Sequence, residues 1–241
     1  MFHEWPFLDR LDAAADAGFA LVECQFPYEA RADAIASRLA RTGLAMTMFN
    51  TPPGNLAAGE LGFAALPDRF ETLAASVETA LAYAAALDVE ALHLLAGRTG
   101  DDASARQAFR RNLAWAAERL DRQGITLLIE PVNARDNPGY FLTDLGAAEK
   151  AIRELALTNV RLQYDTYHRR TDGGAIAEEI QGLLPIVGHV QVSSPPDRGE
   201  PDEETVAFLR LLDSLGYGGV VGCEYIPRTA TLDTLGWRER L

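Results

Sequence analysis

The chain is poor in several residue types on which common enzyme chemistries depend. Lys150 is the only lysine of its 241 residues and falls within a predicted helix, which excludes a lysine Schiff base on a core strand. Two cysteines, Cys24 and Cys223, are too few for a secreted disulfide scaffold, and neither has a neighbouring histidine that would activate a thiol. Four histidines are too few for a tri-zinc site. We therefore expect chemistry that uses neither amine nor thiol nucleophiles.

Long apolar runs and a basic surplus are also missing. No apolar run approaches the roughly 18 residues that a membrane span needs, and the first residues lack the basic and apolar regions of a signal peptide. These absences predict a cytoplasmic protein without a membrane partner. The net charge of -13 argues against nucleic acid as a partner, because its binding requires a basic face. Residues 97–100 hold too few glycines for a nucleotide-binding loop.

The remaining composition is that of one globular domain covering residues 1–241. Hydrophobic residues make up 48% of the chain, and its length suits a single α/β barrel. Helical and strand-like segments alternate from end to end, which predicts a parallel sheet surrounded by helices. Seven predicted strands end near Gln25, Asn50, Leu95, Glu130, Asp165, Gln191 and Glu224. The expected fold is a (β/α)8 TIM barrel of which seven strands are visible.

The count leaves one strand of an eight-stranded barrel unassigned. Residues 7–18 read as the first helix, so the missing first strand would precede Met1. We expect residues 20–26 and 220–225 to lie on either side of a gap at its place. Direct pairing of these two segments in a closed seven-stranded ring would contradict this expectation.

Four successive predicted strands each end on an oxygen-bearing side chain. Residues 125–129 are a short, β-branched apolar run, and Pro131 stops the strand directly after its terminal carboxylate. In a fold of alternating strands and helices, the carboxyl ends of all strands lie on one face. We therefore expect one site to contain Glu130, Asp165, Gln191 and Glu224.

Like charges packed together at a barrel mouth require a cation between them. An all-oxygen set suits Mg²⁺ or Mn²⁺ better than zinc. A helix N-cap or a loop salt bridge would explain any one of these residues alone. His189 shares the strand face of Gln191 and is either a further ligand or a core histidine, and Glu23 and Gln25 share a strand face from which they could support the metal shell.

Polar residues that follow strand ends are candidates for substrate binding. His168 comes a few residues after the strand that ends on Asp165, and Arg198 a few residues after the one that ends on Gln191. Arginine binds carboxylates in a bidentate manner. Asn50 opens a long loop at another strand end, and Arg98 is a weaker candidate of the same kind. For each of them, an exposed loop position is the alternative.

Short motifs spread over nearly the whole chain carry a family resemblance. They are FPY at 26–28, Asn50 with PG at 53–54, AAGE at 57–60, LIEPVN at 128–133, PGY at 138–140, QYDTYH at 163–168, GHVQ at 188–191, DRGEP at 197–201 and GCEY at 222–225. Together they resemble the hydroxypyruvate isomerases of the xylose-isomerase-like TIM barrel superfamily. The metal-binding motifs alone are shared with ketose 3-epimerases.

The resemblance implies a site and a reaction. Divalent-metal ligands would be Glu130, Asp165, Gln191 and Glu224, with the two glutamates also transferring protons, and His168 and Arg198 would contact the substrate. The implied reaction converts hydroxypyruvate to tartronate semialdehyde through an enediolate, without an organic cofactor. The implied partner is a small hydroxy-oxo acid or short sugar, and the sequence leaves a homo-oligomer open.

Departures from the family pattern concern the substrate rim. Residues 202–205 read DEET where the family usually has a glycine-rich stretch, Leu56 and Leu61 replace an expected Trp and Arg, and residues 194–195 replace an Asp-Asn pair. Two alternatives therefore stay open: a 2-oxo-tetronate isomerase or ketose 3-epimerase with the same metal site, and a catalytically silent sugar-acid binding protein.

Overall fold

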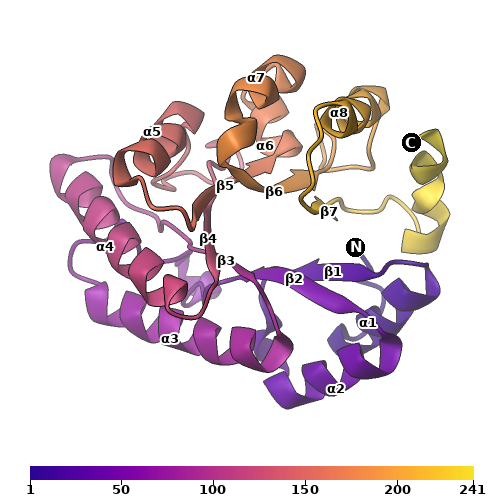
Figure 1. Ribbon diagram of the computed structural model, residues 1–241, viewed down its shortest axis with the longest axis horizontal. Coiled ribbons are helices and arrows are strands. Elements are labelled where there is room, and N and C mark those ends of the chain that lie inside the picture. The colour runs from indigo at the N-terminus through magenta and orange to yellow at the C-terminus, as the bar shows by residue number, and fades with distance from the viewer.

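The computed structural model describes residues 1–241, and its strands form one parallel sheet in chain order. The strands lie inside a ring of helices (Figure 1). Each strand pairs with the next, as expected for repeated βα units. The strands are β1 (Leu21–Cys24), β2 (Ala45–Asn50), β3 (Ala91–His93), β4 (Thr126–Ile129), β5 (Val160–Asp165), β6 (Val187–Val192) and β7 (Val221–Cys223). The predicted barrel architecture with seven strands is confirmed.

Helices connect the strands and begin at side chains that cap their free backbone N–H groups. Asp102, Asp144 and Asp202 each accept a hydrogen bond from the backbone N–H three residues later, which stabilises a helix start by about 1 kcal/mol. The α-helices are α1 (Phe7–Asp16), α2 (Ala32–Thr42), α3 (Phe70–Leu87), α4 (Ala103–Asp121), α5 (Leu145–Leu155), α6 (Thr166–Thr171), α7 (Ile176–Leu183) and α8 (Glu203–Ser214). Short 3-10 helices are η1 (Pro27–Glu29), η2 (Leu56–Ala58), η3 (Leu184–Ile186) and η4 (Thr231–Arg240). None of the helices is long and apolar enough to cross a membrane.

The central strands are buried on both faces, which explains their continuous apolar sequences. Leu127, Leu128 and Ile129 of β4 have no exposed surface. One face of the sheet packs on the helices and the other lines the barrel interior. Both faces are therefore apolar, and the strand sequences do not alternate between apolar and polar residues. Burying each such side chain contributes about 1.5–3 kcal/mol, and this anchoring holds the polar residue after the strand in a defined position.

The sheet does not close, because β1 and β7 are its two edges. A cavity of about 480 Å³ lies along this seam and is lined by residues of α1, β1, β2 and β7. The expected gap between residues 20–26 and 220–225 is confirmed. Side chains bridge it: the amide of Gln25, directly beyond β1, donates a hydrogen bond of 2.6 Å to Glu224, directly beyond β7.

Candidate active site

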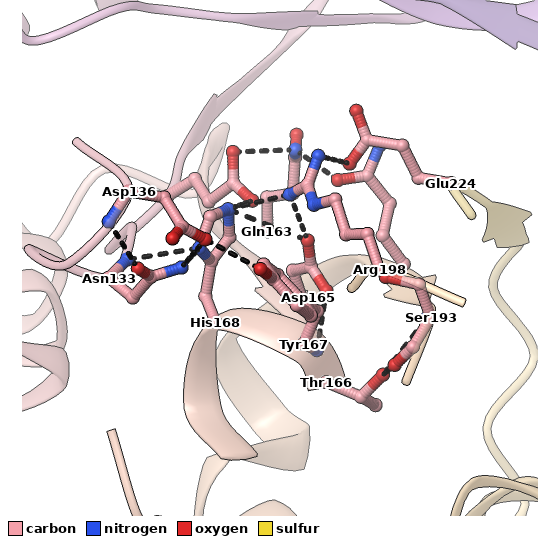
Figure 2. A network of polar contacts seen from close by, with 12 residues as sticks. Asn133, Asp136, Gln163, Asp165, Thr166, Tyr167, His168, Ser193, Arg198 and Glu224 are labelled. Atoms are coloured by element: carbon pink, nitrogen blue, oxygen red, sulfur yellow. Dashed lines mark hydrogen bonds and ion pairs between the residues drawn. The ribbon is translucent and has the colours of Figure 1, made fainter. Parts of the chain in front are cut away.

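The polar ends of β4 to β7 meet at one end of the barrel (Figure 2). Glu130, Asp165 and Gln191 are buried there, and the Glu224 side chain is 20% exposed. Each one lies at or next to the end of an anchored strand, which fixes its backbone without any loop. Two of the four predicted substrate residues, His168 in α6 and Arg198 after β6, reach into the same network.

A buried acid–histidine cluster forms the deepest part of this site. One ligand atom each of Glu130, Asp165 and His168 lies within 4.8 Å of the others. His168 Nε2 is 3.7 Å from Glu130 Oε1 and 3.6 Å from Asp165 Oδ2. Glu130 Oε1 is buried and has no hydrogen-bond partner, an arrangement that costs stability unless a cation or a donor satisfies it. Oxygen and imidazole donors suit a divalent ion, so these residues could hold a metal.

Gln163 connects this cluster to Gln191. Its Nε2 donates to Glu130 Oε2 at 3.1 Å and to Gln191 Oε1 at 2.7 Å. The sequence-based reasoning missed Gln163, although a signal was present, since residues two apart on a strand share one face and Gln163 precedes Asp165 by two. One amide thus holds two of the expected metal ligands together.

Glu23, on β1, orients Gln191 from the other side. Its Oε1 accepts a hydrogen bond of 2.7 Å from Gln191 Nε2, which turns the carbonyl oxygen of that amide toward the site. Its Oε2 lies 2.6 Å from His189 Nε2. Burial opposes ionisation of Glu23, yet the contacts with His189 and Gln191 lower its pKa overall. His189 therefore points toward the carboxylate of Glu23. The hydrogen bond from Gln191 to Glu23 is consistent with the predicted role of Glu23 in supporting a metal ligand.

Arg198 is the cation of the site. Its Nη2 donates to Asp165 Oδ2 at 3.0 Å, and its Nη1 lies 3.4 Å from Glu224 Oε2. The guanidinium also packs 4.9 Å above the ring of Tyr167. The backbone of Arg198 has φ 56°, a left-handed conformation that costs a non-glycine residue about 1–2 kcal/mol and is frequent at functional sites.

Glu224 stands apart from the acid–histidine cluster. Gln25 donates to one of its carboxylate oxygens, and Arg198 faces the other at 3.4 Å. The expected set of four ligands is therefore divided in this structure. Glu130, Asp165 and Gln191 are linked directly or through Gln163, while the guanidinium lies between Asp165 and Glu224.

Burial shifts the proton affinities of these groups. It raises the pKa of Glu130 well above its usual range, and the negative charges of Asp165 and Glu224 raise it further. Burial also raises the pKa of Asp165 and of Glu224, although Arg198 acts against this. Burial and then Arg198 lower the pKa of His168 to about 3, so its imidazole is neutral near pH 7.

The two remaining predicted residues differ in their positions. Asn50 is buried at the end of β2, where its Oδ1 lies 3.1 Å from Nδ1 of His93, and that nitrogen is 3.7 Å from Glu130 Oε2. Asn50 thus borders the site through His93, a residue that the sequence-based reasoning missed. Arg98 is exposed, and its side chain makes no hydrogen bond or ion pair with the site residues. The structure does not bring Arg98 into the network.

Known proteins resemble this chain over nearly its full length. A 2-oxo-tetronate isomerase from Cupriavidus necator is 40% identical over 98% of this chain and 94% of its own length. The hydroxypyruvate isomerase of Escherichia coli is 36% identical over 99% of this chain and 95% of its own length. Both relatives are isomerases by name, and each is matched over at least 94% of its own length.

Solved structures share the fold. A crystal structure from Brucella melitensis, described as an AP endonuclease of family 2, has a TM-score of 0.96 and 42% identity, covering 99% of this chain and 95% of that chain. A D-psicose 3-epimerase from Clostridium cellulolyticum has a TM-score of 0.75 at 17% identity, covering 96% and 84%, and shows the common fold alone. Residues 11–241 match the family model described as a xylose isomerase-like TIM barrel. The chain belongs to the xylose isomerase-like TIM barrel family.

Proposed function

We propose that the protein is an isomerase of short 3-hydroxy-2-oxo acids, with hydroxypyruvate as the simplest substrate. The observation that carries this proposal is the buried, partnerless oxygen of Glu130 beside two nitrogen groups, on His168 and Arg198. A base next to hydrogen-bond donors is what enolisation of a carbonyl compound requires. The names of the full-length relatives support the same reaction class.

The reaction needs no external oxidant. A base removes a proton from C3, and the C2 carbonyl takes up the electron pair as an enediolate. A proton is then delivered to C2, and the C3 hydroxyl gives its proton to the C2 oxygen as it becomes the new carbonyl. Hydroxypyruvate and 2-oxo-tetronate share this three-carbon unit and differ only beyond C3. The altered rim of the site fits this view, because the rim contacts the part of the substrate that varies.

Glu130 and Glu224 are proposed as the proton-transfer pair. The raised pKa of Glu130 strengthens it as a base, since a carboxylate with a higher pKa holds an abstracted proton better. Glu224 lies across the guanidinium of Arg198 and faces the site from β7. Each carboxylate would serve one carbon of the planar enediolate.

Arg198 is proposed to hold the substrate carboxylate or an enediolate oxygen. It is the positive group facing Asp165 and Glu224, and these carboxylates raise its pKa although burial opposes its charge. A permanently charged, planar guanidinium suits a carboxylate ligand. An acidic barrel mouth can thereby admit an anionic substrate.

A divalent metal fits the donor set. Glu130 and Asp165 would hold it, with Gln191 and Glu224 as the further ligands proposed from the sequence. When bound, Mg²⁺ or Mn²⁺ would supply Lewis acidity for the substrate oxygens. The unsatisfied Glu130 oxygen and the excess of carboxylates over cations support such an ion.

Two other functions fit less well. The crystal structure described as an AP endonuclease raises nucleic acid as a ligand, but the net charge of -13 opposes phosphate binding. A silent sugar-acid binding protein would not need a base with a raised pKa in its pocket. Turnover separates the second alternative from the proposal.

The test follows hydroxypyruvate by ¹H NMR in D₂O with the protein and Mg²⁺, and a protein-free sample corrects for spontaneous exchange. We expect signals of tartronate semialdehyde and deuterium at carbon, both strongly reduced for Glu130→Gln. The same measurement with 2-oxo-tetronate and with longer ketoses defines the substrate. Reactions with Mn²⁺ are followed by a discontinuous assay. The proposal would be refuted if no compound showed exchange or product with either metal.

A further inference from the structure

Hydrogen-bond donors surround His168 at its Nδ1 atom. The backbone N–H of Asn133 donates to Nδ1 at 3.0 Å, and the side-chain Nδ2 of Asn133 lies 2.7 Å from the same atom (Figure 2). Both residues are buried, Asn133 completely. A backbone N–H can only donate, so Nδ1 of His168 must accept.

The orientation of the Asn133 amide is equally determined. Its Oδ1 accepts a hydrogen bond of 2.9 Å from the backbone N–H of Asp136, so its Nδ2 must be the atom that faces His168. Asp136 is itself held by the hydroxyl of Tyr167 at 2.6 Å and by the guanidinium of Arg135 at 2.9 Å. Two independent donors therefore face one ring nitrogen.

A neutral imidazole carries one proton, and the two donors at Nδ1 favour its position on Nε2. Nε2 is the atom that faces the acid cluster, 3.7 Å from Glu130 Oε1. Nη2 of Arg198, which can also only donate, lies 2.8 Å from Nε2, so both ring nitrogens face a donor. Nδ1 faces two donors, one of them a backbone N–H, whereas Nε2 faces one at the end of a long side chain. Two donors that meet without an acceptor between them call for an oxygen atom that both can reach.

We propose that Asn133 is a positioning residue that holds His168 in its Nε2–H form. In this form Nε2 has no free lone pair, so His168 donates a hydrogen bond to a substrate oxygen and does not ligate a metal through that atom. Together with Arg198 it would form a pair of donors for the oxygen that becomes negative. The part concerning substrate rests on the proposed function, whereas the tautomer does not.

The tautomer can be measured without any turnover. Long-range ¹H–¹⁵N correlation spectra of the ¹⁵N-labelled protein distinguish the two neutral forms of each of its four histidines. The signals of His168 are identified by their loss in His168→Gln. We expect the Nε2–H pattern in the free protein and after saturation with Mg²⁺. An Nδ1–H pattern, or a change of the Nε2 signal to that of a metal ligand, would overturn the proposal.

A pair of variants tests the assignment to the Asn133 side chain. Asn133→Asp has nearly the same shape but presents an acceptor to Nδ1, so we expect a proton on Nδ1. Asn133→Ala is the matched control, because it keeps the backbone N–H and should keep the Nε2–H form. Loss of a preorganised donor reduces kcat by about 10²–10³-fold, which we expect for the Asp variant, against less than about 10-fold for the Ala variant.

The outcomes separate this proposal from the proposed function. An equal loss of kcat in both variants with an unchanged His168 pattern would assign Asn133 a merely structural part and refute the positioning role. An inactive wild-type protein with the Nε2–H pattern would contradict the function and leave the tautomer established. If Asn133→Asp does not fold, the wild-type spectrum with and without Mg²⁺ still decides which atom carries the proton.

Discussion

The two sides of the barrel mouth are built differently. On the side of β4 to β6, neighbouring strands pair continuously, and Asp165 lies directly opposite Gln191 in the register. Between β7 and β1 no backbone pairing exists, although each strand pairs with its other neighbour. Single side chains span this seam: Gln25 reaches Glu224, and Glu23 reaches Gln191. Sheet pairing joins the strands of the first side, whereas side-chain contacts join the two edges of the second.

This difference shows how a site can combine precision with adaptability. Backbone pairing holds Glu130 and Asp165 in a buried environment in which their pKa values are raised. Across the seam, each position depends on a few hydrogen bonds that can rearrange at small cost. We expect the rate of proton transfer to depend most on residues of the paired side. Binding of metal and substrate should depend more on residues at the seam.

The largest effect is expected for the two proposed proton-transfer residues. Glu130→Gln and Glu224→Gln keep size and an oxygen atom but remove the base, which should lower kcat by about 10²–10⁴-fold with little change in KM. Steady-state kinetics with saturating metal measures this. If only Glu130→Gln loses turnover, proton transfer belongs to the paired side alone and Glu224 is a ligand at most.

Metal binding gives the next effect. Mg²⁺ or Mn²⁺ at 100 times its dissociation constant should stabilise the folded protein by about 2.7 kcal/mol, visible as a raised melting temperature. Asp165→Ala should abolish this rise. His189→Ala is the control, since a supporting role predicts a lower melting temperature with the metal-induced rise retained. A rise that persists in Asp165→Ala would remove that residue from the metal site.

Stability of the metal-free protein should respond in opposite directions on the two sides. The raised pKa of Glu130 means that its ionised form opposes folding near pH 7, so Glu130→Gln should raise the melting temperature. The lowered pKa of Glu23 means that its ionised form favours folding, so Glu23→Gln should cost about 1–3 kcal/mol.

The pH dependence sharpens this contrast. Since the folded-state pKa of Glu23 is depressed, its contribution is complete above the unfolded value of about 4.3 and is lost as the pH falls through the folded value. The difference between wild type and Glu23→Gln should therefore shrink below about pH 4. A constant difference down to pH 3 in chemical denaturation would show that packing, and not charge, explains the loss.

The smallest effect is expected for Arg98→Ala. Arg98 is exposed and stands outside the network, so kcat/KM and the free energy of unfolding should change little, by within about 0.5 kcal/mol for stability. Arg198→Ala, on the seam side, is the contrasting variant and should raise KM. A large loss of affinity for Arg98→Ala would restore the substrate contact that the sequence suggested.

The fold and the strand-end residues could be predicted because they follow from periodicity and chain order. Glu130 had to lie at a barrel mouth once Pro131 ended its strand, and the unassigned strand had to leave a seam next to β1. The supporting residues could not be predicted in the same way. Asn133 and Tyr167 act through contacts between the loop after β4 and helix α6, and such contacts leave no periodic signal.

Arg98 lies outside the network for a related reason. A residue shortly after a strand end lies near the catalytic face, but its side chain can still point to solvent, as the exposed position of Arg98 shows. Arg198 follows its strand by a similar distance, has a left-handed backbone conformation, and turns inward to Asp165 and Glu224. Distance from a strand end therefore locates a loop residue without fixing its direction.

The crossing of the seam by Glu23 has a consequence for how this sequence can diverge. A Cβ atom at Gly222 would overlap the carboxylate of Glu23, so the absence of a side chain at 222 leaves room for the glutamate. Neither position can change freely while the other remains. A side chain at 222 requires the Glu23 carboxylate to move or a shorter residue at 23, and either change disturbs its contacts with Gln191 and His189. In an alignment of relatives, positions 23 and 222 should therefore covary, and Gly222→Ala should be tolerated better in a Glu23→Ala background than in the wild-type protein.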